Sequence, residues 1–218
     1  FDSVNSTGGF VLKKLLKALG VKEIFALNDE PTGVFAHNPE PLPENITDIC
    51  ALVEKEHCHC GFIVDPDVDR LAIVSNTGKP FVEEYTLVAV ADYVLSNTPG
   101  NTVSNLSSSR ALRDVTEKRY NQKYEAAAVG EVNVVAKMKE INAVIGGEGN
   151  GGVIYPECHY GRDALVGIAL FLTLLAKKKI SCQDLRDSYP NYVIAKKKME
   201  LTPEIDVDLV LSSMAEKY

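Results

Sequence analysis

The sequence predicts an α/β protein made of two consecutive three-layer α/β/α domains with mainly parallel sheets. Short apolar runs of strand length alternate along the chain with segments whose apolar residues recur at helical spacing. This alternation favours parallel sheets covered by helices on both faces. With 218 residues, of which 45% are hydrophobic, the chain is long enough to fill two cores of ordinary size.

The first domain is expected to occupy residues 1–80. A polar turn follows its first strand, and Gly20 ends its first helix. A proline-rich stretch at residues 28–43 is expected to lack regular structure. Asn45 or Thr47 can cap the next helix. The expected elements, in chain order, are a strand at 1–4, a helix at 11–19, a strand at 23–27, a helix through Ile49, Leu52 and Val53, and strands at 61–64 and 71–74.

The second domain is expected over residues 81–190. Its last helix, at residues 162–178, is the longest and carries Leu, Ile and Phe on most faces, so it should be largely buried. The lysines at 177–179 suit the negative end of that helix dipole. The elements before it are a helix at 83–95, a strand at 102–106, a helix capped at Ser107, Ser108 or Ser109, a strand at 123–129, a helix at 132–141 and a strand at 143–145.

Residues 191–218 are expected to be a linker and the start of a further domain. A strand of mixed character should begin at Tyr192, and residues 207–214 form an amphipathic segment. Both ends of the chain look cut from a longer protein.

Three carboxylates lie in the loop between the strands at 61–64 and 71–74. Asp65, Asp67 and Asp69 repel one another when they converge, and a hard divalent cation is the usual compensation. We therefore expect a Mg²⁺ site. Arg70 follows directly and suits a phosphate, because guanidinium binds phosphate in a bidentate manner.

The acidic loop has two other interpretations. An EF-hand needs Gly at its sixth position and Glu at its twelfth, where this chain has Arg70 and Asn76, so that interpretation fails. An acidic surface turn stays open, because Asp is common in turns for backbone reasons alone.

A glycine-rich run, GGEGNGG at residues 146–152, formally contains the dinucleotide fingerprint. That fingerprint needs a helix directly behind the glycines, whereas residues 153–156 read Val-Ile-Tyr-Pro, and Glu148 would repel a pyrophosphate. Glu148 and Asn150 instead suit sugar hydroxyls, and Gly147 and Gly149 would let the ligand approach the backbone. A flexible surface turn is the alternative.

Composition argues against two classes of partner. The net charge of −7 gives no basic footprint for a nucleic acid, and no apolar run approaches the roughly 18 residues of a membrane span. Five unevenly spaced cysteines favour the reducing cytoplasm over a disulfide framework. His-Cys-His-Cys at residues 57–60 is a weak zinc pattern, because alternate residues of an extended segment face opposite ways and no second ligand pair follows.

The two loops, in this order and spacing, resemble those of the α-D-phosphohexomutases. The stretch TVSNLSSSR at residues 102–110 and Val-Gly-Glu at 129–131 add to the similarity. This family comprises phosphoglucomutase, phosphomannomutase and phosphoglucosamine mutase enzymes with four domains. The chain is similar to the second and third domains, with the start of the fourth in its tail. Domains 1 and 4 would then be missing partners from the same parent chain.

The resemblance implies an intramolecular phosphotransferase, classed as an isomerase. A phosphoserine on the first domain would exchange phosphate with a hexose phosphate through a hexose 1,6-bisphosphate. Asp65, Asp67 and Asp69 would hold Mg²⁺, Arg70 would help hold phosphate, and Glu148 would bind sugar hydroxyls. The family's serine motif is absent, since its nearest look-alike at residues 35–39 carries Ala36. We therefore expect this chain alone to be inactive.

Several alternatives are left open. Asn150 stands where relatives usually carry Ser, and Gly152 where several carry His, so the sugar is not defined and a phosphoglucosamine mutase is possible. A phosphatase phosphorylated on Asp65 is disfavoured by Pro66 and by the lack of a downstream Lys and acidic pair in register. A non-catalytic sugar- or metal-binding module is the alternative from another class.

Overall fold

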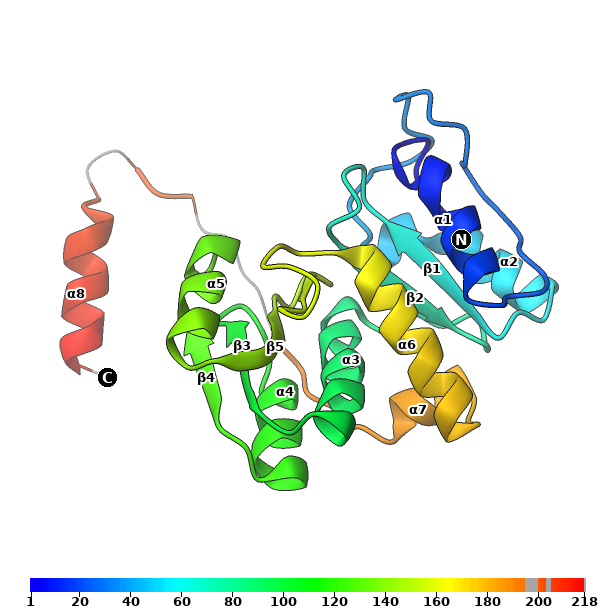
Figure 1. The fold of residues 1–218 in the computed structure, drawn as a ribbon. Coiled ribbons are helices and arrows are strands. Elements are labelled where there is room, and N and C mark those ends of the chain that lie inside the picture. The colour runs from blue at the N-terminus through cyan, green and yellow to red at the C-terminus, as the bar shows by residue number, and fades with distance from the viewer. Residues whose placement is uncertain (195–199, 203–204, 218) are drawn as a thin grey trace.

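The computed structural model describes residues 1–194, 200–202 and 205–217 and confirms the predicted α/β fold class. Two sheets lie side by side, and helices cover the faces of each (Figure 1). The chain enters through the first sheet, builds the second, and then returns to the first with one long helix. That return places residues from both halves around one region between the sheets.

The first sheet is centred on an antiparallel pair, β1 (Cys60–Val64) and β2 (Leu71–Ser75), in which Cys60 lies opposite Ser75 and Val64 opposite Leu71. Parallel pairing comes from Asp2, which bridges to Leu27 on one side and to Ile63 on the other. The strands expected at 1–4 and 23–27 are therefore only single bridges. The reason is local, because Val4 turns into the left-handed region with φ of 49° and the chain leaves the sheet there.

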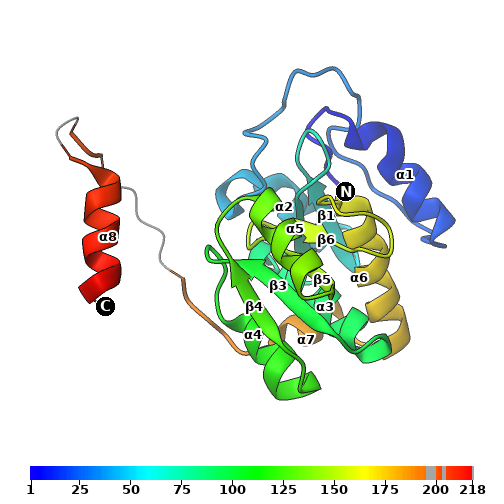
Figure 2. The ribbon, with the colours of Figure 1, turned by 60° about the vertical axis from the view of Figure 1, so that its left-hand side comes forward.

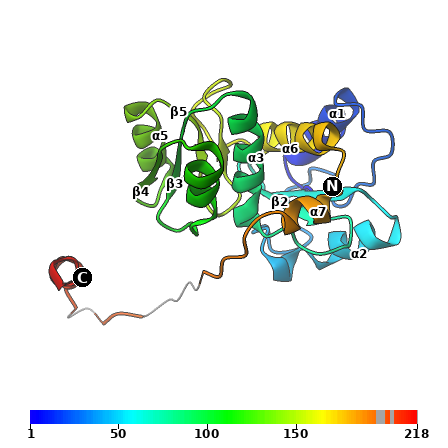
Figure 3. The ribbon, with the colours of Figure 1, turned by 90° about the horizontal axis from the view of Figure 1, so that it is seen from below.

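Helices cover both faces of this first sheet. On one face, α2 (Thr47–Lys55) packs Ile49 and Val53 against Ile63 and Val74. On the other face lie α1 (Gly8–Ala18) and α6 (Ala164–Lys178), and Figure 3 shows these two helices together over the sheet. The stretch at residues 28–42 has no regular structure, as expected, and a short 3-10 turn, η1 (Pro43–Asn45), precedes α2.

The hydrophobic core is continuous between the two halves. Phe171 of α6 meets the edge of Phe62 at 6.1 Å and of Phe81 at 5.3 Å between ring centroids. A single buried cluster includes Leu12 and Phe62 from the first half together with Phe171. The expected boundary at residue 80 thus has no break in the core, although the two halves have separate sheets.

The second sheet has the strand order β4-β3-β5-β6, and its first three strands are parallel. The last strand, β6, pairs antiparallel with β5. On one face, α5 packs Val134 and Met138 against the sheet, and α3 and α4 cover the other. The bounds are α3 (Glu83–Asn97), β3 (Asn101–Asn105), α4 (Ala111–Asp114), the π-turn η2 (Val115–Arg119), β4 (Tyr124–Ala127), α5 (Glu131–Glu140), β5 (Ala143–Gly147) and β6 (Val153–Ile154).

The most buried helix is α3, which corrects the expectation for residues 162–178. Both α3 and α6 have 15 residues, but α3 is buried on most sides, whereas α6 buries one stripe ending at Leu174. The difference follows from position, because α3 lies between the sheets and α6 lies on an outer layer. Lys177 and Lys178, at the end of α6, contact Tyr93 and Asp92 of α3.

The C-terminal part begins with α7 (Cys182–Asp187), after which residues 190–194 have no regular structure. The strand expected from Tyr192 is therefore absent as far as residue 194, and residues 195–199 lie outside the described part. The amphipathic segment forms α8 (Val207–Lys217), which stands apart from the other elements with no buried residue (Figure 2). None of the described helices combines the length and apolar character needed to cross a bilayer.

Candidate active site

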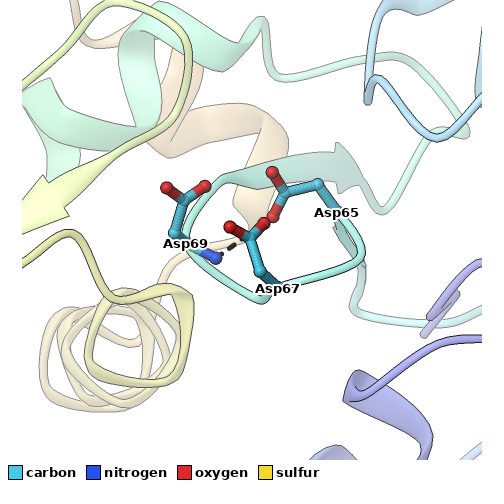
Figure 4. Close-up of side chains that lie close together, drawn as sticks. All are labelled: Asp65, Asp67 and Asp69. Atoms are coloured by element: carbon cyan, nitrogen blue, oxygen red, sulfur yellow. Dashed lines mark hydrogen bonds between the residues drawn. The ribbon is translucent and has the colours of Figure 1, made fainter. Parts of the chain in front are cut away.

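The loop between β1 and β2 brings the three predicted metal ligands together. Asp65, Asp67 and Asp69 each offer a carboxylate oxygen, and these oxygens all lie within 4.8 Å of one another (Figure 4). Asp65 is fully buried and Asp67 is exposed. The loop folds around the Asp65 carboxylate, whose Oδ1 accepts the amides of Asp69 at 3.1 Å and Arg70 at 3.0 Å.

The acidic loop is anchored from three sides. The Ser6 hydroxyl, just before α1, donates to the Pro66 carbonyl at 2.9 Å. The Ala164 amide, at the start of α6, donates to the Val68 carbonyl at 3.0 Å. The Leu71 amide donates to the Gly151 carbonyl at 3.1 Å, which ties the acidic loop to the glycine-rich loop. The two loops predicted separately from the sequence are thus neighbours in space.

Arg70 contacts carboxylates of its own loop. Its Nε donates to Asp65 Oδ2 at 2.6 Å, and it lies 3.7 Å from both Asp69 and Glu40. Burial by itself raises the pKa of Asp65, but the hydrogen bonds from Arg70 outweigh it and hold that pKa below the ordinary value. Burial, followed by the Asp65 carboxyl beside it, raises the pKa of Asp69 to about 6.

The glycine-rich loop is packed and forms the turn between β5 and β6. Glu148 is 4% exposed, and its amide donates to the Gly152 carbonyl at 2.9 Å. A Cβ at Gly147 would lie 2.0 Å from that same carbonyl oxygen, and one at Gly149 would lie 2.9 Å from Ser108 Oγ. Glycine is required at both positions because the backbone passes so close to its neighbours.

Both oxygens of Glu148 already have donors. Asn105, at the end of β3, donates to Oε1 at 2.8 Å, and the Gly130 amide donates to the same oxygen at 3.3 Å. Arg162 donates to Oε2 at 2.7 Å. Asn150 accepts the Gly152 amide at 3.2 Å and so supports the turn. Glu148 is therefore held in a fixed orientation at the carboxyl end of the parallel strands, where ligands of α/β sheets bind.

Arg162 is a site residue that the sequence did not predict. Its guanidinium pairs with Asp69 of the acidic loop, with Glu131 at 3.1 Å and with Glu148 at 2.7 Å. Sequence reasoning placed Arg162 only at the start of a helix. Nothing in the local pattern signals these pairs, because Asp69 lies 93 positions away in the chain.

The predicted serine cap of α4 is not formed, because the helix begins later than expected: its N-cap residue is Arg110, and no side chain caps it. Ser108 and Ser109 instead stabilise the turn before the helix. Ser109 Oγ accepts the Ala111 amide at 3.1 Å, and Ser108 Oγ donates to Asn105 Oδ1 at 2.9 Å. Through Asn105, the second of these bonds also supports Glu148. These contacts fit a supporting role around the glycine-rich loop.

The donor set of the acidic loop fits a hard divalent cation. Carboxylate oxygens are the ligands that Mg²⁺ and Ca²⁺ prefer, and three of them converge here. In the part of the chain that the structure describes, this is the one group of three or more His, Cys, Asp or Glu close enough to share an ion. The zinc interpretation of residues 57–60 gains no support, and burial raises the pKa of Cys60 to about 12.

Both halves of the chain are similar to domains of one known family. Residues 1–78 match the family described as phosphoglucomutase/phosphomannomutase, alpha/beta/alpha domain II, and residues 83–192 match domain III of the same family. The phosphoglucomutase/phosphomannomutase of Thermococcus kodakarensis is 34% identical over 217 residues, covering 99% of this chain and 47% of that protein. A phosphoglucosamine/phosphogalactosamine mutase of Sulfurisphaera tokodaii is 29% identical over 221 residues, covering 100% of this chain and 48% of that protein.

The fold agrees with a solved structure as well. A phosphoglucomutase/phosphomannomutase family protein from Burkholderia thailandensis has a TM-score of 0.80 at 31% identity, covering 88% of this chain and 42% of that one. The chain spans about half the length of the curated relatives that it matches. On both the sequence and the fold, the chain belongs to the phosphoglucomutase/phosphomannomutase family.

Proposed function

We propose that this chain is the central part, domains 2 and 3, of a Mg²⁺-dependent phosphohexomutase. The parent enzyme would interconvert hexose 1-phosphate and 6-phosphate through a phosphoserine and a hexose 1,6-bisphosphate. The observation that carries the proposal is the meeting of the acidic loop and the Glu148 loop around Arg162. Family membership supplies the reaction class.

Each predicted site residue has a role in this proposal. Asp65, Asp67 and Asp69 would hold Mg²⁺, which when bound neutralises charge on the oxygens of a transferring phosphoryl group. Arg70 would bind a phosphate in bidentate fashion. Its side chain is 28% exposed beside the acidic loop, which supports this proposal.

The glycine-rich loop would bind the sugar. Glu148 would accept hydrogen bonds from the hydroxyls in a position fixed by Asn105 and Arg162. Asn150 offers an amide at the same turn, and Gly147 and Gly149 would contribute to the sugar site through their tightly packed backbone. A phosphoglucosamine mutase is the second candidate, favoured by the relative of that type that aligns with the whole chain.

The chain alone is proposed to be inactive and to depend on domains 1 and 4 of its parent. A cytoplasmic location is proposed from the five cysteines, all of which are free thiols. A non-catalytic sugar- or metal-binding module would share the site residues but not the reaction.

Phosphorus NMR can test the proposal. The 218-residue chain and its full-length parent are each incubated with Mg²⁺, a hexose 1,6-bisphosphate and, separately, the 1-phosphates of glucose, mannose and glucosamine. We expect 6-phosphate only from the parent, with the preferred sugar converted fastest and EDTA stopping the reaction. Conversion by the chain alone would overturn its proposed inactivity.

No conversion of any sugar phosphate by the parent would overturn the mutase assignment. Sugar-phosphate binding without conversion would then support the binding module. Asp67→Asn in the parent is the control for Mg²⁺ dependence, because it removes one proposed metal ligand from an exposed position.

A further inference from the structure

Arg162 lies where carboxylates from three separate elements meet. Its Nη2 pairs with Asp69, its Nε donates to Glu131 Oε2 at 3.1 Å, and its Nη1 donates to Glu148 Oε2 at 2.7 Å. The side chain is only 20% exposed. One guanidinium charge is thus shared among three carboxylates, so a stronger hold on one weakens its hold on the others.

The backbone around Arg162 is fixed to both loops. Arg162 forms an antiparallel bridge with Ile154, and the Ala164 amide donates to the Val68 carbonyl at 3.0 Å. The side chain passes directly over Gly152, where a Cβ would lie 2.4 Å from Arg162 Cδ. The guanidinium is therefore held between the two loops, within reach of all three carboxylates.

A cation on the acidic loop competes with Arg162 for Asp69. We infer that Arg162 is a positioning residue that makes Mg²⁺ binding and the availability of Glu148 antagonistic; the inference rests on the proposed function, which assigns Mg²⁺ to that loop. When Asp69 turns to the metal, Arg162 holds Glu148 more tightly. Because linkage is reciprocal, weakening the Glu148 contact must strengthen the hold on Asp69 and lower Mg²⁺ affinity.

The sign of this coupling suits the proposed reaction. In the proposed reaction, a hexose 1,6-bisphosphate would have to reorient between the two phosphate transfers. A Glu148 carboxylate held by Arg162 binds sugar hydroxyls less tightly, which allows the sugar to turn. Without Arg162, Mg²⁺ binding at the acidic loop would no longer affect sugar binding at Glu148.

Calorimetric titration of the 218-residue chain with Mg²⁺ tests the inference. Glu148→Gln is made in the natural chain and in Arg162→Met. We expect it to weaken Mg²⁺ binding about fivefold more in the natural chain than in the Arg162→Met chain, at the low end of usual coupling. A purely structural role of Arg162 would not produce this difference.

Glu40→Gln is the matched control. Glu40 Oε1 lies 3.7 Å from Arg70 Nη1, so its ion pair in the described structure is with Arg70. It therefore measures the loss of a nearby negative charge that pairs with Arg70, and we expect its effect on Mg²⁺ affinity to be equal in both backgrounds. Arg162→Lys keeps the charge but not the planar fork, so it should behave like Arg162→Met. It also serves as the background if Arg162→Met does not fold.

The outcomes separate the inference from the proposed function. An equal effect of Glu148→Gln in both backgrounds, with Mg²⁺ binding still lost in Asp67→Asn, would overturn the coupling and leave the metal site standing. Unchanged Mg²⁺ binding in Asp67→Asn would overturn the metal site and the coupling with it.

Discussion

At the scale of single residues, the three aspartates of the acidic loop differ in burial and in hydrogen bonding. Asp65 is buried and accepts bonds from the Asp69 amide and from both the amide and the guanidinium of Arg70, so it organises the loop. Asp67 is exposed, and its side chain makes no such loop-organising hydrogen bond in the described structure. The contribution of the aspartates to Mg²⁺ affinity can therefore be separated from their contribution to stability by mutation.

Asp67→Asn should abolish most Mg²⁺ affinity while changing the free energy of unfolding by less than about 0.5 kcal/mol, as for other exposed positions. Asp65→Asn should lower both the Mg²⁺ affinity and the free energy of unfolding. The loss of stability should be about 1–3 kcal/mol, because buried donors lose a charged acceptor. Calorimetry with Mg²⁺ and urea unfolding of each variant measure the two effects. Equal destabilisation by the two substitutions would contradict this division of roles.

Gly149 tests how closely the glycine-rich loop must pack. A Cβ at this position would lie 3.0 Å from the Ser107 carbonyl oxygen, so Gly149→Ala must shift backbone. We expect a loss of about 1–3 kcal/mol in unfolding free energy, as for overpacked sites. The full-length parent should show a higher KM for sugar phosphate, while the Mg²⁺ affinity stays unchanged. An unaltered KM would remove Gly149 from the proposed sugar site.

At this scale, the convergence of the three aspartates could be predicted, because they are close in the chain; their role as metal ligands stays a prediction. Asp65, Asp67 and Asp69 share one short loop, so their convergence follows from spacing alone. Arg162 and Asn105 were missed as site residues because their partners lie in other elements, joined only by the fold. The ligand roles of Glu148 and Asn150 remain predictions.

At the scale of elements, Asp92 joins three of them, α3, η2 and α6, through one buried carboxylate. Asp92 in α3 accepts Arg119 of η2 and Lys178 of α6 at 2.8 Å each, and the hydroxyls of Tyr120 at 2.7 Å and Tyr189 at 2.9 Å. Burial alone raises the pKa of Asp92, but the hydrogen bonds from Lys178, Tyr120 and Arg119 outweigh it and lower the pKa. This carboxylate therefore stabilises the fold in its charged form.

The lowered pKa fixes the sign of a pH effect. Stability from Asp92 is fully present above the ordinary Asp value of about 3.9 and is lost as pH falls through its lower folded value. Asp92→Asn should cost about 1–3 kcal/mol at pH 7, because its cationic partners are partly solvated and keep some of their hydration. Urea unfolding at pH 7 and near pH 3 should show the difference between the two proteins shrinking at the lower pH. A constant difference would mean that the charge of Asp92 is not what stabilises the network.

The elements themselves were mostly predictable from periodicity and caps. The helices at 83–97 and 131–140 and the parallel strands of the second sheet lie close to their expected positions. The relative burial of α3 and α6 was not predictable, because both are rich in apolar residues. Only the position of α3 between the two sheets decides which is enclosed.

At the scale of the whole molecule, the hydrophobic core is continuous across the boundary expected near residue 80. Helix α6 comes from the second half, yet its Phe171 is fully buried against Phe62 and Phe81. Sequence patterns show how far each element is amphipathic but not which sheet a returning helix will cover. The separation of the two sheets was predictable, whereas the shared core was not.

A shared core implies that the described halves unfold together. Phe171→Ala should lower the free energy of unfolding by about 3–5 kcal/mol, as expected for a large buried aromatic. Because the cavity lies where the halves meet, urea unfolding followed by both circular dichroism and tyrosine fluorescence should keep one common transition, shifted to lower urea. Phe10→Ala is the matched control, since Phe10 is 60% exposed on α1, and it should change stability by less than about 0.5 kcal/mol. Two separate transitions in the natural chain would show that the halves are independent folding units in spite of their continuous core.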